Sequence, residues 1–385
     1  MMCVFRSFSL GAFAGLALAT YFIVGCSQDV SGPVQVQLMQ PTGLHCGYTI
    51  APATLHTLQN LISLHGSVGR VVYLDENVDA RPEILDNGAG FQSIDVSFSN
   101  HGGIYHALDY STLFSVSLYY AVERGYTLFS SWDADIPRLA AQWRFNETLI
   151  VHEGRRTLGD VGVDGEVTDN GEYRPHKVQR PDGGFDIRNY IFSYPTLEVT
   201  DLPLGLNMGI MVHEYAHMIF NFLFEEPRRA MGSSYDTRAT VMTIRSIDEG
   251  LSDYFGYLAT GDPGYFLCTF PTENRDVSVP KFWSDSTMLQ LKSDRQFDPH
   301  VGGAVFASVQ YQIGQSIAGG HLANARSLLQ MVRQLTLCAN TNQGSFRMDF
   351  PAVAQCHLSA LGAGESQSVA RGIYERSGLL YSGAP

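Results

Sequence analysis

The segment His213-Glu214-Tyr215-Ala216-His217 constrains the fold of this chain more than any other, because it lies inside the hydrophobic stretch Leu204 to Phe224. Residues four apart share one face of a helix, so a helix here would place both imidazoles on the same side. Two imidazoles so placed can bind one metal ion, with the Glu214 carboxylate beside the open coordination position. The stretch therefore predicts a buried helix that carries two metal ligands, His213 and His217, and a candidate general base.

A hydrolytic zinc site uses three protein ligands and a water molecule, so a third ligand must come from elsewhere in the chain. Glu249 is the candidate, 32 residues after His217, in the run Ile247 to Gly256. Asp253 follows Glu249 at helical spacing. If this run is a second helix, Glu249 can reach the metal while Asp253 accepts a hydrogen bond from the outer nitrogen of a ligand histidine. Carboxylates so placed fix the tautomer and orientation of ligand imidazoles.

Together the two blocks resemble the thermolysin-like and fungalysin-like zinc peptidases, the gluzincins. Those families carry HExxH and, further on, a glutamate ligand with Asn, Asp or Gly before it, Ala or Gly after it, and then an aspartate and a glycine at fixed spacing. The chain matches this second pattern at Asp248, Glu249, Gly250, Asp253 and Gly256.

The resemblance implies an α+β fold, a two-lobed zincin with a mixed sheet-containing N-terminal lobe, a mainly helical C-terminal lobe and the active-site helix between them. It also implies Zn²⁺ as the cofactor and a peptide or protein as the substrate. The peptide bond would be hydrolysed by a metal-activated water molecule, with Glu214 as general base.

A looser resemblance covers residues 298–307, where these families have a glycine pair that opens a helix and a nearby histidine that faces the substrate. It implies that His300 helps to stabilise the oxyanion of the tetrahedral intermediate, while an exposed loop histidine is the alternative. Tyr235 could donate its hydroxyl to the same oxyanion, although an ordinary loop or core tyrosine is the favoured interpretation.

Upstream, residues 106–125 are expected to form an amphipathic helix, similar to the long helix that precedes the active site of thermolysin-like enzymes. Residues 189–192 are expected to form a strand shortly before the helix of His213. In the family an edge strand at that place hydrogen-bonds the extended substrate backbone, as peptides that bind by strand addition do. An ordinary core strand is the alternative.

The first 25 residues have the composition of a secretory signal, with Arg6 as the one charged residue and an apolar run from Leu10 to Val24. This run is too short and wrongly flanked for a spanning helix. It leads into Cys26 through Ile-Val-Gly, which resembles the bacterial lipobox, whose cysteine is lipidated and becomes the first mature residue. Ser27 stands where an aspartate would retain a lipoprotein at the inner membrane, so the resemblance implies a lipid anchor in the outer membrane of the cell envelope. An uncleaved anchor, or ordinary cleavage beside a coincidental cysteine, is the alternative.

The charge of the chain bears on its partners. Removing Arg6 with the signal leaves 24 Lys and Arg against 38 Asp and Glu, a net charge of −14. No cluster of Lys and Arg offsets this charge, so nucleic acid is not expected as a partner. Membrane attachment would come from lipid rather than from charge.

The cysteines suggest disulfides rather than a metal site. Cys3 leaves with the signal and Cys26 would be lipidated. Four cysteines remain: Cys46, Cys268, Cys338 and Cys356. None has CxxC spacing, which disfavours a thiolate zinc site. An even set of four in an oxidising envelope suggests two disulfides. Cys338 with Cys356 is the preferred pair because the two are close in sequence, although three connectivities are possible and free buried thiols are the alternative.

The expected organisation has four segments: a signal peptide over residues 1–25, a tether over 26–48, an α+β lobe over 49–202, and the active-site helix with a helical lobe over 203–385. The tether rests on a Ser, Gln, Pro and Gly content with little periodicity. Short alternating apolar runs predict strands before residue 200, and helical apolar spacing predicts helices after residue 203.

The acidic, glycine-rich run Asp160 to Glu172 offers oxygen ligands that would suit Ca²⁺, which related peptidases use for stability. Its spacing departs from that of an EF-hand because Gly162 and Gly171 occupy the third and twelfth positions. A solvated loop is the favoured interpretation, with a calcium site as the alternative.

Two other functions stay open on the sequence alone. A lipoprotein of the same fold could keep the metal and act in binding or assembly, but Glu214 argues against this, because a non-catalytic metal site needs no base. Alternatively, residues 213–217 form a buried helix by coincidence, with both histidines satisfied by core partners, which predicts no stoichiometric zinc. An endopeptidase is the favoured form of the enzyme, with exopeptidase and envelope-processing roles open, and no motif sets the substrate specificity.

Overall fold

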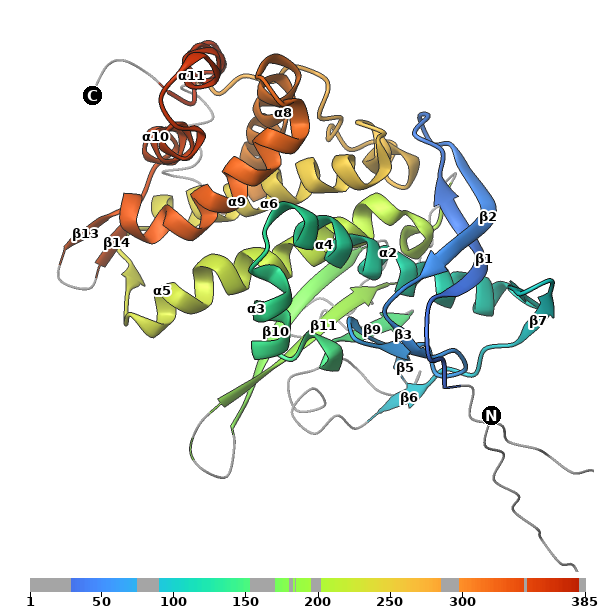
Figure 1. Cartoon of the computed structure of the whole chain (residues 1–385). Coiled ribbons are helices and arrows are strands. Elements are labelled where there is room, and N and C mark those ends of the chain that lie inside the picture. Colours follow the sequence, from blue (N-terminus) through green and yellow to red (C-terminus); the bar gives the residue numbers. More distant parts are fainter. Residues whose placement is uncertain are drawn as a thin grey trace, which may run out of the picture.

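The computed structural model describes residues 29–74, 90–152, 170–179, 183, 185–194, 202–284, 298–342 and 345–380. Within them the chain is mixed α+β, with strands predominant before residue 195 and helices after residue 202 (Figure 1). The expected α+β class is confirmed at this level. The segment expected to be a signal peptide, Cys26 and residues 160–169 of the acidic run lie outside the described residues.

The larger sheet contains seven strands in the described part of the chain. Its order is β10 (Gly171–Gln179), β11 (Phe185–Ser193), β9 (Leu149–His152), β5 (Gly69–Leu74), β4 (His65–Gly66) and β3 (Leu58–Asn60), with β6 (Phe91–Ser93) also paired to β5. The sheet is mixed, because β9 is parallel to β5 and β11 while β10 is antiparallel to β11.

The position of β11 corrects one expectation. Residues 189–192 lie in this strand, so the predicted strand is confirmed, but β11 pairs with a neighbour on each side and is interior. The edge next to the helix of His213 is formed by β10 instead, among the described residues. The position of residues 189–192 in the sequence could not show this. It depends on β10, which precedes β11 in the chain and pairs with it antiparallel, so that β10 takes the edge position.

A second sheet has the order β2 (Tyr48–Leu55), β1 (Val34–Pro41), β8 (Ile104–Ala107) and β7 (Phe98–His101). Residues 34–48 therefore do not form the expected tether. Val34, Val36 and Leu38 alternate along β1 and are buried, which is the two-residue period of a half-buried strand. The Gln residues between them gave the segment a polar composition and concealed that alternation.

The helix expected over residues 106–125 is observed as α2 (Tyr110–Trp132). It begins later than expected because Asp109 caps it, accepting a hydrogen bond from the Thr112 backbone N–H at 2.7 Å. His106 lies in β8. Two short elements follow, α3 (Ile136–Gln142) and η1 (Phe145–Glu147).

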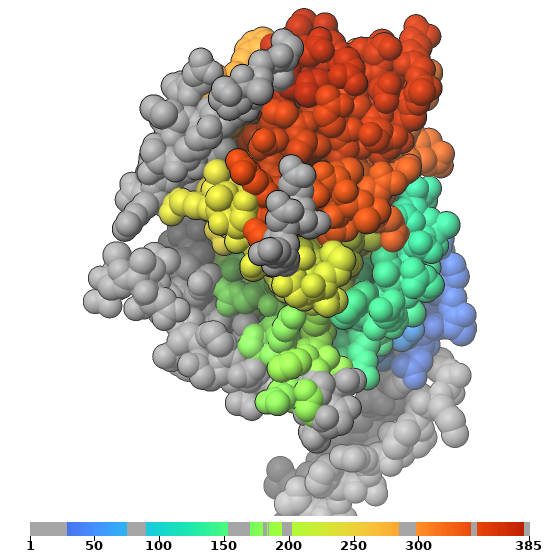
Figure 2. Space-filling view, turned by 90° about the vertical axis from the view of Figure 1, so that its left-hand side faces the viewer, coloured from blue at the N-terminus to red at the C-terminus, as the bar shows by residue number. Residues whose placement is uncertain are grey.

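The remaining described chain is mainly helical, as expected. Its elements are η3 (Leu204–Leu206), α4 (Met208–Phe220), the π-helical η4 (Asn221–Glu225), α5 (Glu226–Ala230), α6 (Arg238–Thr260), η5 (Tyr265–Cys268), α8 (Pro299–Ser316), α9 (Gly320–Cys338), α10 (Phe350–Leu361) and α11 (Glu365–Ser377). A small sheet joins β12 (Ser234–Tyr235), β14 (Ser345–Arg347) and β13 (Asn340–Asn342). Figure 2 shows the described residues after 300, in orange and red, gathered at one end of the molecule. None of the helices in the described residues is both long and apolar enough to cross a membrane.

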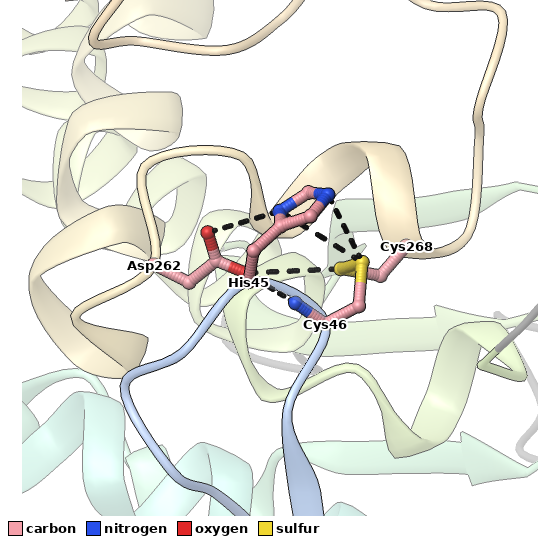
Figure 3. A group of neighbouring side chains, drawn as sticks. All are labelled: His45, Cys46, Asp262 and Cys268. Carbon is pink, nitrogen blue, oxygen red and sulfur yellow. Dashed lines mark hydrogen bonds and ion pairs between the residues drawn. A yellow bond between two sulfur atoms is a disulfide. The ribbon is translucent and has the colours of Figure 1, made fainter.

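Among the described residues, two disulfides link distant or neighbouring elements. Cys338–Cys356 joins α9 to α10, which confirms the preferred pair. Cys46–Cys268 joins the turn between β1 and β2 to the end of η5, across 222 residues of sequence. Figure 3 shows this bond beside His45 and Asp262. Asp262 accepts a hydrogen bond from the Cys46 backbone N–H at 2.8 Å and so holds the turn against the connection between α6 and η5.

Candidate metal centre

Helix α4 carries the HExxH segment and packs against α2, α6 and β10, in the middle of the molecule (Figure 1). Asn207 caps it, since its side-chain oxygen accepts hydrogen bonds from the backbone N–H groups of Gly209 and Ile210, at 3.1 and 3.4 Å. Every residue of α4 except His217 is buried. Burial on all sides explains the continuous hydrophobic stretch in the sequence.

The three predicted metal ligands converge on one point. The Nε2 atoms of His213 and His217 are 3.0 Å apart, and Glu249 Oε2 lies 3.3 Å from the first and 3.7 Å from the second. Tetrahedral zinc with bonds of about 2.0 to 2.1 Å separates its ligand atoms by about 3.3 Å. The spacing of this donor set, two nitrogens and a carboxylate oxygen, therefore fits a zinc ion.

Glu214 lies beside these ligands and is buried. Its Oε2 accepts a hydrogen bond from the Tyr173 backbone N–H of β10 at 2.8 Å. Gly171 permits this close approach, because a Cβ there would lie 2.9 Å from Glu214 Oε1. Burial raises the pKa of the Glu214 carboxyl, although His213 and His217 act in the opposite direction. A carboxylate with a raised pKa is suited to taking up a proton near neutral pH.

Asp253 lies behind His213, as the sequence predicted. Its Oδ1 is 3.1 Å from His213 Nδ1, the nitrogen that faces away from the ligand cluster. Arg275 holds the same carboxylate with two hydrogen bonds, at 2.6 and 3.2 Å, and its guanidinium lies over the Phe266 ring. Burial alone would raise the pKa of Asp253, but Arg275 and His213 hold it below its usual value. Asp253 thus stays charged and fixes the ring of His213.

His217 has a corresponding partner that sequence reasoning missed. Asp248 Oδ1 lies 2.9 Å from His217 Nδ1, and Ser252 Oγ lies 3.2 Å from the same nitrogen. Burial lowers the pKa of His217, but Asp248 and Glu249 outweigh it and raise that pKa to about 10. In the sequence Asp248 only matched the family pattern around Glu249. Its position directly before the ligand Glu249 was the one signal that could have identified it as a partner of His217. No pattern in the sequence pointed to Arg275 or to the backbone of Tyr173.

The structure brings His300 to the same site. Its Nε2 lies 3.2 Å from Glu249 Oε2, and its Nδ1 lies 2.6 Å from Asp298 Oδ1. The glycines of α6 and α8 make this possible: a Cβ on Gly250 would lie 2.5 Å from the backbone oxygen of Gly303. Close contact of the two helices there places His300 at the first turn of α8, with its side chain 40 % exposed.

Tyr235 lines the same cleft, but its hydroxyl is engaged. It donates a hydrogen bond to Glu225, and the Arg228 guanidinium lies 4.0 Å above its ring. The hydroxyl proton therefore points to Glu225 in this structure, which is consistent with the favoured interpretation of a structural tyrosine.

The ligands open into a cleft of about 750 Å³ lined by β10, α4, α6 and the start of α8. The residues that line it near Glu214 include Gly171, Tyr173 and Pro175 of β10. An extended chain could therefore lie along this edge strand beside the ligands.

A second group of candidate ligands lies elsewhere and is not a metal centre. It consists of His45, Cys46, Asp262 and Cys268. Figure 3 shows the two sulfurs bonded to each other, so only an imidazole and a carboxylate remain. Residues 170–172 of the acidic run are described, and the carboxylate of Glu172 pairs with Arg174 at 2.8 Å.

Comparison with known proteins finds no family model that matches this chain and no curated protein that is similar to it.

Proposed function

We propose that this protein is a zinc-dependent peptidase of the gluzincin kind, with a two-lobed thermolysin-like arrangement. The observation that carries the proposal is the convergence of His213, His217 and Glu249 at zinc-ligand spacing, beside the buried carboxylate of Glu214. A cleft of about 750 Å³ adjoins them. Neither a structural core helix nor a storage site requires a buried base at this position.

When bound, zinc would polarise the substrate carbonyl and lower the pKa of a water molecule toward neutrality. Glu214 would take a proton from that water and later deliver it to the leaving amine. The Tyr173 N–H holds the Glu214 carboxylate in place, since it donates to one of its oxygens. His300, held by Asp298, would donate to the oxyanion of the tetrahedral intermediate.

The proposal includes the place where the enzyme acts. Lipid attached to Cys26 would anchor it in the outer membrane of the bacterial envelope, with a peptide or protein as substrate. An oxidising compartment agrees with the two disulfides. Labelling with a radioactive fatty acid, compared between the parent and Cys26→Ser, tests this part by itself.

The deciding experiment combines zinc analysis with a protease assay on an unbiased peptide mixture. The parent is expected to contain one zinc and to cleave peptides, and Glu214→Gln is expected to keep the zinc and lose the cleavage. His213→Ala serves as the control that loses zinc. Zinc without cleavage in the parent would favour a binding or assembly lipoprotein, and a parent without zinc would favour a coincidental buried helix.

A further inference from the structure

Among the described residues, four arginines line the cleft beside the candidate metal centre: Arg228, Arg229, Arg245 and Arg275. Three of them are neutralised by carboxylates. Arg228 binds Glu225 at 2.8 Å, Arg229 binds Glu226, and Arg275 binds Asp253 at 2.6 Å. Arg245 differs from the others. It is exposed, and within the described chain no hydrogen bond or ion pair involves it.

Arg245 lies on the face of α6 that also carries two acidic residues of the site. Asp248 and Glu249 follow it by three and four residues, spacing at which side chains can pair on a helix. Neither carboxylate forms an ion pair with Arg245. Asp248 contacts His217 instead, and Glu249 lies among the three histidines of the site. The guanidinium thus keeps its charge unmatched in a chain whose net charge is −13.

The helix geometry places Arg245 relative to a bound peptide. Four residues of α-helix advance by about 6 Å, so Arg245 lies about one turn along α6 from the ligand Glu249, and both residues line the cleft. An extended peptide advances by about 3.3 Å per residue. A peptide that ran parallel to α6 would therefore place a residue about two positions from the bond at the metal beside Arg245. Val241, one turn further, lines the same wall.

We propose that Arg245 forms a carboxylate-binding subsite in the cleft, about two residues from the scissile bond. The guanidinium offers paired N–H donors that match a carboxylate, and its pairing with one is charge-assisted. A negatively charged protein repels acidic peptides at long range, so a cation at this place selects for them locally. The scissile bond in this statement rests on the proposed function, whereas the binding of a carboxylate does not.

A carboxylate in this subsite has two sources, and they imply different enzymes. The side chain of Asp or Glu within a longer substrate suits an endopeptidase. The α-carboxylate at the end of a substrate suits an exopeptidase that removes short C-terminal pieces. The chemistry that recognises them is the same, so the experiment separates the two by amidating the peptide.

The test uses fluorescence anisotropy with labelled peptides and the full-length, zinc-loaded Glu214→Gln protein, which holds peptides without cleaving them. Peptides of one scaffold carry Glu or Gln either two residues before or two residues beyond the target bond, each with a free or an amidated C-terminus. The carboxylate that occupies the subsite is expected to tighten binding about five- to tenfold. Added Arg245→Gln should remove this preference, and added Arg245→Glu should reverse it.

Arg326→Gln is the matched control, because Arg326 is an exposed helical arginine on α9 outside the cleft. It should leave the preference unchanged. If the Glu peptide binds more tightly than the Gln peptide even when both are amidated, the side chain is the source of the carboxylate. If the free peptides bind more tightly than the amidated ones whichever residue they carry, the C-terminus is the source. Equal binding of all the peptides, or a preference for the carboxylate that Arg245→Gln does not alter, overturns the proposal. A parent that cleaves no peptide would overturn the peptidase function while a preference lost in Arg245→Gln would still support the subsite.

Discussion

At the scale of single residues, Asp253 connects the candidate metal centre to the protein behind it. One of its oxygens faces His213 and both accept hydrogen bonds from Arg275, so the carboxylate is fixed from two sides. Carboxylates behind ligand histidines hold the ring orientation and raise the basicity of the ligand. The position of this residue, four after Glu249, was readable from the sequence because both lie on one helix face.

Asp253→Asn is expected to weaken zinc binding by about 10- to 100-fold. The neutral amide of asparagine lacks the negative charge with which Asp253 orients the His213 ring. Competition with a coloured zinc chelator measures the affinity. Asp133→Asn is a matched control, since Asp133 also accepts two hydrogen bonds from one guanidinium, that of Arg333. An unchanged affinity in Asp253→Asn would show that the aspartate acts only on stability.

His357 makes the stability of the protein depend on pH. It is buried between Ser327 Oγ and the Tyr374 hydroxyl, each 2.8 Å from one ring nitrogen. Burial lowers its pKa from about 6.5 to about 3. The unfolded chain therefore takes up a proton that the folded chain does not, so stability is complete above pH 6.5 and is lost as pH falls toward 3.

Between pH 6.5 and pH 5 this single histidine is expected to cost about 2 kcal/mol of stability, at about 1.4 kcal/mol per pH unit. Urea unfolding at pH 7 and at pH 5 measures the loss. In His357→Gln the loss should be smaller by about that amount, even if the variant is less stable at both pH values. Equal losses in the parent and the variant would contradict this assignment.

At the scale of elements, helices were easier to predict than strands. The helix of His213 and that of Glu249 were both foreseen, because burial and ligand spacing repeat with the helical period. Strand β10 was missed, since its residues are mostly half-buried and show no alternation. Arg275 was missed for another reason. It lies in a segment without regular structure, and its contact with Asp253 depends on the path of that segment in space.

Helix α4 depends on the residue that precedes it. Asn207 caps the helix with its oxygen, and its amide donates to Tyr265 O at 2.9 Å and to Thr269 Oγ1 at 3.0 Å. Loss of the cap costs about 1 kcal/mol. Buried partners left without a hydrogen bond add about 1 to 3 kcal/mol.

Asn207→Ala is therefore expected to lower the free energy of unfolding by about 2 to 4 kcal/mol, measured by urea denaturation. Asp109→Ala is the control, because Asp109 caps α2 but makes no comparable second set of buried contacts in the described chain. It should cost about 1 kcal/mol. Similar losses in the two variants would mean that the amide contacts of Asn207 contribute nothing measurable.

At the scale of the whole molecule, the sequence indicated where strands and where helices predominate, but not how these elements pack together. The change from strands to helices near residue 200 follows from local patterns of apolar residues. The order of strands does not, because β9 pairs with β5 and β11 from distant parts of the chain. The convergence of β10, α4, α6 and α8 on one cleft is a property of that assembly, so the cleft walls could not be read from the motifs that supplied the ligands.

The Cys46–Cys268 disulfide links the first strands to the region beside the candidate metal centre. It closes a loop of 222 residues, whereas Cys338–Cys356 closes one of 18. In the chain-entropy model a longer loop restricts the unfolded chain more. The two bonds should then contribute about 5 and about 3 kcal/mol to stability, respectively.

Replacing Cys46 and Cys268 together with serine is thus expected to destabilise the protein by about 2 kcal/mol more than replacing Cys338 and Cys356 together. Urea unfolding of both double variants and the parent, under oxidising conditions, gives the comparison. Asp262 should still accept the backbone N–H of residue 46 in the first variant, so the turn keeps one attachment to the connection between α6 and η5. A larger loss from the shorter loop would show that native-state packing around α9 and α10, rather than chain entropy, sets the contribution of each disulfide.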